Sequence, residues 1–239
     1  LLYLKQSHHK NIKKKHIDYF LTPSENLTQF VSNHFKKEGK TLANPILIKQ
    51  NQNSNSEGKY ILFVGRLVPE KGVLTLLKAF QNISKQFPNE KLWIVGDGNQ
   101  IEELQIFVEN NELKNVSFLG NKSREELLEI YANSKFSVVP SEYLEAYGNV
   151  ILESLAIGKT VITSDLVGIK EEIEQNNVGL TYSFKNQEAL EEKMVELLSN
   201  SGLKSELENN IPNYLVNKTF AKHFSDLVNV YENLLSRNR

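Results

Sequence analysis

Six short apolar runs, each followed by a polar or amphipathic stretch, constrain the fold of this 239-residue chain most strongly. They read YILFV, LWIV, VSFL, FSVV, TVIT and GLTY, and they lie between residues 60 and 182. The runs are apolar without a period of two, which is typical of strands buried on both faces. Strands of this kind that alternate with amphipathic segments predict an α/β fold, with a parallel sheet and helices on both of its faces.

The segments on either side of this alternating region have other patterns. Residues 17–21 form an apolar run, and Pro23 and Ser24 open a segment with helical spacing, so we expect a strand, a turn and a helix. Residues 50–58 are polar throughout, which is the composition of a linker, and we place a domain boundary there. Residues 218–237 carry one apolar stripe, which predicts a helix that packs on another surface.

Composition narrows the classes of function. A formal net charge of -1 argues against a nucleic-acid partner, because proteins that bind nucleic acids carry a basic excess. The chain has no cysteine, which excludes disulfides and cysteine-ligated metals and suits a cytoplasmic protein. No apolar run reaches the roughly 18 residues of a membrane-spanning helix. The chain begins without methionine and without a signal-peptide pattern, so we expect it to be a fragment that lacks upstream residues.

The first candidate site is the sequence GRLVPEKG, residues 65–72, between the run YILFV and a helix expected from Val73. Ligands of open parallel sheets bind at the carboxyl ends of strands, and this loop belongs there. Arg66 and Lys71 supply a guanidinium and an ammonium beside a helix N-terminus, which itself favours anions. Taken alone, both side chains are better explained as solvated surface charges, and the second candidate site changes this balance. The ligand that fits the whole pattern is a pyrophosphate.

The second candidate site follows the run FSVV. Glu145 and Glu153 are separated by seven residues, with Gly148 and Asn149 between them where a helix is expected to start. Backbone amides from Gly148 to Val150 have no partner within such a helix and can bind a phosphate. Glu153 lies one turn further on, where it can accept hydrogen bonds from ribose hydroxyls. Solvent-facing helix charges are the alternative, and the glycine at a strand-to-helix junction favours the binding site.

In their order and spacing these segments resemble the glycosyltransferase group 1 (family 4) enzymes, which are retaining transferases of the two-domain GT-B fold. GRLVPEKG is similar to their arginine and lysine phosphate motif, and EAYGNVILE is similar to their paired-glutamate motif. LWIVGDG and VSFLG resemble the segments between these motifs. IDYFLTPSE with LANPI, residues 17–46, resembles the end of the acceptor domain and the crossing into the donor domain.

The resemblance implies that the chain consists of three parts. Residues 1–48 are the end of the N-terminal acceptor-side domain with the interdomain crossing. Residues 49–212 are a Rossmann-like domain that binds the nucleotide sugar. Residues 213–239 are a C-terminal helix that packs back toward the N-terminal domain.

The resemblance also implies a role for each site residue. Five residues would contact the donor diphosphate: Arg66, Lys71, Gly148, Asn149 and Val150. Glu153 would bind the ribose, and Glu145 would face the transferred sugar as the catalytic residue. Gly120 and Asn121 would lie beside the nucleobase.

The chain departs from the family pattern at two places. The segment between Ser141 and Glu145 is one residue longer than the family's commonest form. Where the family often has two glycines before a third acid, this chain reads VGIKEE, with Val167 in place of the first glycine. Gly168 and Glu171 remain candidates for contacts with the sugar or the phosphate.

The implied activity is transfer of a sugar, with retention of configuration, from a nucleoside-diphosphate sugar (UDP or GDP) to a glycan or lipid-linked acceptor. We expect a role in polysaccharide biosynthesis, for example of a bacterial surface glycan. The chain contains no Asp-x-Asp pair, so we expect neither a metal nor a cofactor. We expect a cytoplasmic enzyme, with the inner face of the membrane as the alternative location. The run Lys13–Lys15 can contact anionic lipid, but a plain solvated face explains these three lysines better.

Two alternatives to this activity stay open. The chain by itself would hold a nucleotide without catalysis if its upstream domain is required, or it would be a GT-B phosphorylase that uses free phosphate. Two other motifs do not indicate a function. GDGNQI, residues 96–101, lacks the third glycine of a dinucleotide fingerprint. GKT, residues 158–160, resembles the end of a phosphate-binding P-loop, but a strand rather than a helix is expected after it. Metal-ligand spacing is absent from all five histidines: His8, His9, His16, His34 and His223.

Overall fold

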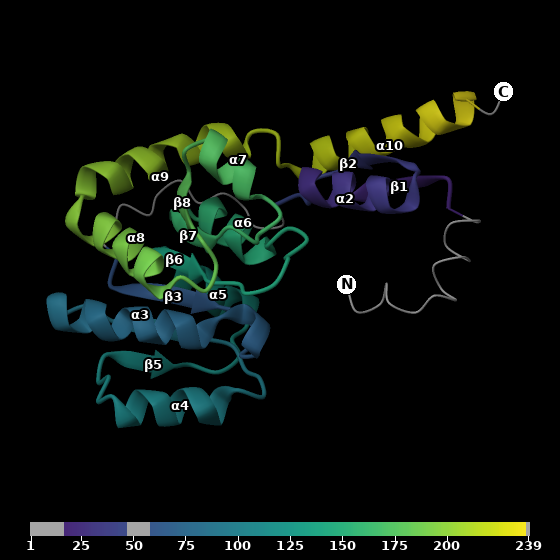
Figure 1. Cartoon of the computed structure of the whole chain (residues 1–239). Coiled ribbons are helices and arrows are strands. Elements are labelled where there is room, and N and C mark those ends of the chain that lie inside the picture. The colour runs from purple at the N-terminus through teal and green to yellow at the C-terminus, as the bar shows by residue number, and fades with distance from the viewer. Residues whose placement is uncertain (1–16, 47–57, 238–239) are drawn as a thin grey trace.

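The computed structural model describes residues 17–46 and 58–237. A larger α/β part and a smaller part, made of β1, α2, β2 and α10, lie side by side (Figure 1). Several expectations fall outside the described residues: the linker up to residue 57, the boundary between residues 48 and 49, Lys13–Lys15, and His8, His9 and His16.

The larger part contains a six-stranded parallel sheet in the order β5-β4-β3-β6-β7-β8. Each strand coincides with one of the six apolar runs: β3 (Tyr60–Val64), β4 (Leu92–Val95), β5 (Val116–Phe118), β6 (Ser134–Val139), β7 (Val161–Ser164) and β8 (Gly179–Tyr182). The predicted Rossmann-like parallel sheet is therefore confirmed.

Helices cover both faces of this sheet. One face carries α3 (Val73–Gln86), α4 (Ile101–Asn110) and α8 (Gln187–Ser199), and the other carries α5 (Arg124–Ala132), α6 (Asn149–Ala156), α7 (Lys170–Gln175) and most of α9 (Ser201–Leu215). Ile61 and Phe63 of β3 pack toward the first set, whereas Tyr60 and Leu62 pack toward α5. Alternate residues of each strand are buried on opposite faces of the sheet. The strand sequences therefore do not alternate between apolar and polar residues.

The strand order reverses between β3 and β6. The chain runs outward from β3 through β4 to β5, then returns to β6 and runs outward through β7 to β8. The loops that follow β3 and β6 are therefore neighbours, and the Glu142 amide donates a hydrogen bond to the Glu70 carbonyl at 2.8 Å. Such a reversal point, at the carboxyl ends of the strands, is where open α/β sheets bind their ligands.

The smaller part begins with β1 (Tyr19–Thr22), α2 (Glu25–Phe35) and β2 (Glu38–Thr41), and β1 and β2 pair in parallel. The predicted strand, turn and helix over residues 17–35 are confirmed. The strand β2 was not expected from the sequence, because EGKT contains no apolar residue.

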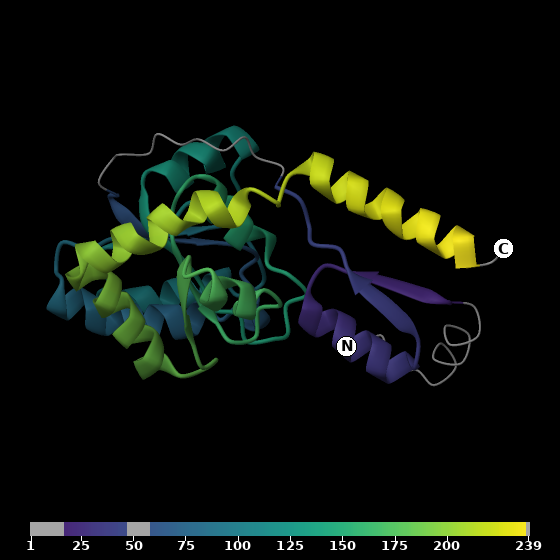
Figure 2. The ribbon, with the colours of Figure 1, turned by 90° about the horizontal axis from the view of Figure 1, so that it is seen from above.

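The last helix, α10 (Phe220–Arg237), lies beside this small sheet (Figure 2). His223 Nδ1 donates a hydrogen bond to the Ala43 carbonyl at 2.8 Å, and Arg237 forms an ion pair with Glu38. Val230 is buried, but five apolar residues of the predicted stripe are exposed: Phe220, Phe224, Val228, Tyr231 and Leu235. Leu227 and Leu234 of the stripe are half-buried on the side of α10 that carries Val230, so the stripe packs only in part against the described residues.

Candidate functional site

Loops from several strands are joined by backbone hydrogen bonds at the carboxyl edge of the sheet. The Leu67 amide donates to the Asp97 carbonyl at 2.9 Å, which links the loops after β3 and β4. The Gly96 amide donates to the Gly120 carbonyl at 2.9 Å, which adds the loop after β5. Together with the Glu142–Glu70 hydrogen bond between the loops after β3 and β6, these bonds place the two candidate motifs on one continuous edge.

Lys71 and Glu145 meet at the reversal point and form an ion pair. Their side chains are only 15% and 8% exposed, so this is a largely buried pair. Ser141 Oγ donates to Glu145 Oε2 at 2.8 Å, and the Tyr143 hydroxyl donates to Glu145 Oε1 at 3.4 Å. Buried charges need such additional partners, because desolvation otherwise exceeds the attraction of the pair. The carboxylate of Glu145 is therefore held in one position.

Tyr143 also contacts the ammonium group of Lys71. Lys71 Nζ donates to the Tyr143 hydroxyl at 3.3 Å and lies 5.1 Å from the centre of its ring. Ser141 and Tyr143 were not assigned roles from the sequence. The signal for them was the extra residue between Ser141 and Glu145, which lengthens the loop on which Tyr143 lies.

Arg66 follows β3 at the same edge of the sheet. Its side chain is exposed and forms no ion pair with any of the described residues. The Lys71 charge, in contrast, is balanced by Glu145. These three side chains together carry one net positive charge, which favours an anionic ligand.

The helix α6 begins beside the Glu145 carboxylate. Gly148 is its N-cap residue with φ 93°, and a Cβ added there would lie 2.8 Å from Ile151 Cδ1 and 3.9 Å from Glu145 Oε2. Asn149 is exposed and Val150 is half-buried. The amides of a first helical turn have no acceptor within the helix, so this end of α6 can donate hydrogen bonds to an anion.

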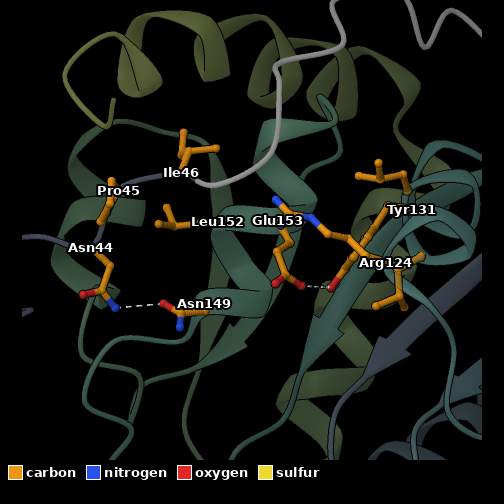
Figure 3. A pocket seen from close by; sticks show the side chains of 10 residues that line it. Asn44, Pro45, Ile46, Arg124, Tyr131, Asn149, Leu152 and Glu153 are labelled. Atoms are coloured by element: carbon orange, nitrogen blue, oxygen red, sulfur yellow. Dashed lines mark hydrogen bonds between the residues drawn. The ribbon is translucent and has the colours of Figure 1, made fainter. Parts of the chain in front are cut away.

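Glu153 lines a cavity of about 520 Å³ between α5, α6 and residues 44–46 (Figure 3). The Tyr131 hydroxyl donates to Glu153 Oε2 at 3.0 Å, and Asn44 Nδ2 donates to Asn149 Oδ1 at 2.9 Å (Figure 3). Burial raises the pKa of the Glu153 carboxyl, although the Tyr131 hydrogen bond and the Arg124 charge act in the opposite direction. A pocket with a mainly apolar lining and one partly desolvated carboxylate suits a ligand that brings its own hydroxyl groups.

Sequence reasoning missed Arg124 and Tyr131, which line the same cavity. Ser123 and Glu126 form a capping box, and this residue pattern marks the start of α5 in the sequence. The sequence contained no signal that the α5 side chains face Glu153. Gly120 and Asn121 are exposed in the loop before α5 and are not among the described residues that line the cavity.

Gly168 and Glu171 face the smaller part of the chain. A Cβ added at Gly168 would lie 2.2 Å from the Ala146 carbonyl oxygen, and Glu171 accepts a hydrogen bond from Asn26 Nδ2 at 2.7 Å. Their contacts with a sugar or phosphate stay a prediction.

Two further classes of feature are absent from the described part of the chain. Within residues 17–46 and 58–237, no group of three or more histidine or acidic side chains is arranged to hold a metal ion. In the same ranges, no helix has the length and apolar character needed to cross a bilayer.

Comparison with known proteins gives a family match. A family model described as glycosyl transferases group 1 matches residues 46–214. An uncharacterized glycosyltransferase of Methanocaldococcus jannaschii is 35% identical over 172 residues, which are 71% of this chain and 46% of the relative. A Campylobacter jejuni protein is 31% identical over 181 residues, which are 74% of this chain and 49% of the relative. Its name is GalNAc-alpha-(1->4)-GalNAc-alpha-(1->3)-diNAcBac-PP-undecaprenol alpha-1,4-N-acetyl-D-galactosaminyltransferase. The chain therefore spans about half the length of these curated relatives.

Solved structures share the fold at low sequence identity. A mutant of S. aureus TarM, in complex with Fondaparinux, alpha-GlcNAc-glycerol and UDP, has a TM-score of 0.82 and 20% identity, covering 92% of this chain and 45% of that one. The pneumococcal O-GlcNAc transferase GtfA, in complex with UDP and GlcNAc, has a TM-score of 0.79 and 17% identity, covering 96% of this chain and 47% of that one. Both support the GT-B fold.

Proposed function

The chain belongs to the glycosyl transferases group 1, and we propose that it binds the nucleoside-diphosphate sugar from which the protein transfers a sugar with retention of configuration. The observation that carries this proposal is the convergence of Lys71, Glu145 and the Gly148 end of α6 at the reversal point of the sheet. Two solved structures of the same fold contain UDP, which supports a nucleotide ligand.

The donor diphosphate would be bound by Arg66, Lys71 and the first amides of α6. Charge-assisted hydrogen bonds of this kind are each worth about 1.5 to 3 kcal/mol. Their contribution grows as the sugar bond breaks, because negative charge then develops on the departing diphosphate. Two cationic side chains and the positive end of a helix dipole meet this charge without a metal ion.

Glu145 would face the transferred sugar. The Lys71 ammonium has three protons, and Glu145 and Tyr143 accept two of them. The third proton would reach the diphosphate, so that one lysine joins the phosphate subsite to the sugar subsite. In this arrangement Glu145 orients Lys71 and also presents its carboxylate to the sugar.

Glu153 would bind the ribose. Its carboxylate lines the cavity beside α5 and accepts one hydrogen bond from Tyr131. A carboxylate has about four acceptor positions, so hydroxyl groups of a ribose can be bound in addition to Tyr131.

The acceptor would be a glycan or a lipid-linked glycan. The name of the Campylobacter jejuni relative contains a glycan on PP-undecaprenol, which supports this class. Because the chain spans about half the length of its relatives, we propose that it holds the donor and that transfer requires further parts of the protein. No observation favours the phosphorylase alternative.

Calorimetric titration of UDP and of GDP tests the donor site. Wild type would be compared with the double variant Arg66→Ala, Lys71→Ala. The matched control is Lys59→Ala, Lys91→Ala, which removes two exposed lysines from the opposite edge, just before β3 and β4. We expect one nucleotide to bind to wild type and to the control, and to lose at least about tenfold in affinity in the first variant.

Two outcomes would contradict this proposal. If neither nucleotide binds to wild type, the chain does not hold the donor by itself. If both double variants weaken binding equally, the effect is one of net charge, and the assignment of Arg66 and Lys71 to the diphosphate is wrong.

A further inference from the structure

The loop between Glu145 and Gly148 is held by a side chain from the smaller part of the chain. Ser24 is fully buried, and its hydroxyl donates to the Ala146 carbonyl at 2.7 Å. Ser24 is also the N-cap residue of α2, where a serine hydroxyl normally binds an amide of its own helix. In this structure it forms no such cap bond, so its hydroxyl serves the loop instead of the helix.

Gly168 closes the other side of this contact. A Cβ added to Gly168 would lie 2.2 Å from the Ala146 oxygen and 2.7 Å from Ser24 Oγ, so only glycine fits. The Glu145 amide donates to the Leu166 carbonyl at 3.0 Å, which ties the same loop to the segment after β7. The backbone on both sides of the Glu145 side chain is thereby fixed.

The next residue of the loop, Tyr147, is held from the C-terminal crossing. Lys218 Nζ donates to the Tyr147 hydroxyl at 3.2 Å, forms an ion pair with Glu172, and lies 5.0 Å from the centre of the Tyr214 ring. The Lys218 carbonyl accepts a hydrogen bond from the Ile46 amide at 2.7 Å. The chain passes between the two parts of the structure near Ile46 and again near Lys218. Tyr147 therefore lies where these two connecting segments come together.

We propose that Ser24 and Lys218 are positioning residues of the donor site, which hold Ala146 and Tyr147 so that Glu145 and the Gly148 end of α6 keep a fixed spacing. Both lie outside the segment matched by the family model. Only two residues separate Glu145 from Gly148, so a shift of either one changes the distance between the sugar-facing carboxylate and the phosphate-binding amides. The inference rests on the proposed function, and it makes donor affinity depend on the placement of α2 and α10.

Two variants with matched controls test this proposal. Ser24→Ala removes the hydroxyl that holds Ala146, and its control Ser32→Ala removes another α2 hydroxyl that is buried without a hydrogen-bond partner among the described residues. Lys218→Met removes the charge that holds Tyr147. Its control Lys222→Met removes the same charge one turn later, from a partly exposed pair with Asp226.

Each protein would be measured in two ways. The carbonyl carbon shift of Ala146 and the amide exchange of residues 145–149 report whether the loop is held, with no ligand present. Titration of UDP and GDP then reports the donor site. We expect Ser24→Ala to move the Ala146 carbonyl shift, and we expect both variants to raise loop exchange and weaken nucleotide affinity, each about three- to tenfold. The controls should match wild type.

The proposal is overturned if both variants leave loop exchange and affinity at the wild-type values. If neither nucleotide binds to wild type, the donor-binding proposal fails, and the carbonyl shift and exchange rates still decide whether Ser24 and Lys218 hold the loop. If Ser24→Ala unfolds the chain, the test rests on Lys218→Met and its control Lys222→Met. Equal loop exchange and equal affinity in these two variants would then overturn the proposal.

Discussion

Glu153 shows how the carboxylate of the proposed ribose site is kept at the expense of stability. Burial raises the pKa of its carboxyl, so the folded chain binds this proton more tightly than the unfolded chain. The destabilising effect of ionisation is complete above the folded pKa. It decreases as the pH falls below that value and vanishes below the unfolded pKa. The Tyr131 hydrogen bond offsets only part of this effect.

We therefore expect Glu153→Gln to raise the free energy of unfolding at pH 7, with the difference from wild type vanishing below a pH of about 4.3. Nucleotide affinity should fall about tenfold or more in the same variant, because a charged acceptor is lost. Urea unfolding at several pH values and calorimetry measure the two effects. Glu192→Gln, an exposed position on α8, should change neither. A variant less stable than wild type at pH 7 would contradict the assigned effect of burial.

Gly148 combines a left-handed backbone with a close contact. Ala at this position is expected to cost about 1 to 2 kcal/mol for the positive φ alone, and more because its Cβ would lie 2.8 Å from Ile151. Gly120→Ala is the matched control, since Gly120 has φ 66° and nothing within 4 Å of an added Cβ. Urea unfolding should show a larger loss for Gly148→Ala than for Gly120→Ala. Equal losses would mean that the α6 end tolerates a side chain.

At the scale of elements, the start of α5 depends on its capping box. The Ser123 side chain accepts from the Glu126 amide, and the Glu126 side chain accepts from the Ser123 amide. This box fixes the helix that presents Arg124 and Tyr131 to the cavity. Ser123→Ala should lower the free energy of unfolding by about 1 kcal/mol.

The comparison for this cap is Ser205→Ala, an exposed serine in the interior of α9. Because alanine has a higher helix propensity than serine, Ser205→Ala should raise the free energy of unfolding by about 0.5 kcal/mol. Thermal or urea unfolding of both variants measures the two effects. A loss of similar size at both positions would show that the cap has no specific effect.

At the scale of the whole molecule, the two parts of the structure differ in burial. Ile61 and Leu62 of the central strand β3 are fully buried, whereas every residue of β2 is exposed or half-exposed. Amide exchange in β3 and β6 should therefore proceed only through global unfolding, and exchange in β1 and β2 should be faster by on the order of 100-fold or more. Mass-spectrometric exchange measures both regions in one experiment. Equal protection would show that the chain unfolds as a single unit.

Much of the fold could be predicted because burial leaves a local record in the sequence. The six apolar runs marked the six strands, and the box at Ser123 and the glycine at 148 marked two helix starts. β2 could not be found in this way, because its four polar and small residues pair with β1 through the backbone alone.

The sequence by itself thus determined the class of fold and the family of the chain, and it predicted the edge of the sheet at which a ligand would bind. Only the tertiary structure decided which side chains meet. The strand order brings the loops after β3 and β6 together, so that Lys71 pairs with Glu145 across 74 residues. Ser24 reaches the carbonyl of Ala146 across 122 residues. Periodicity reports whether a residue is buried, but its partner depends on strand order and helix placement, which no local pattern encodes.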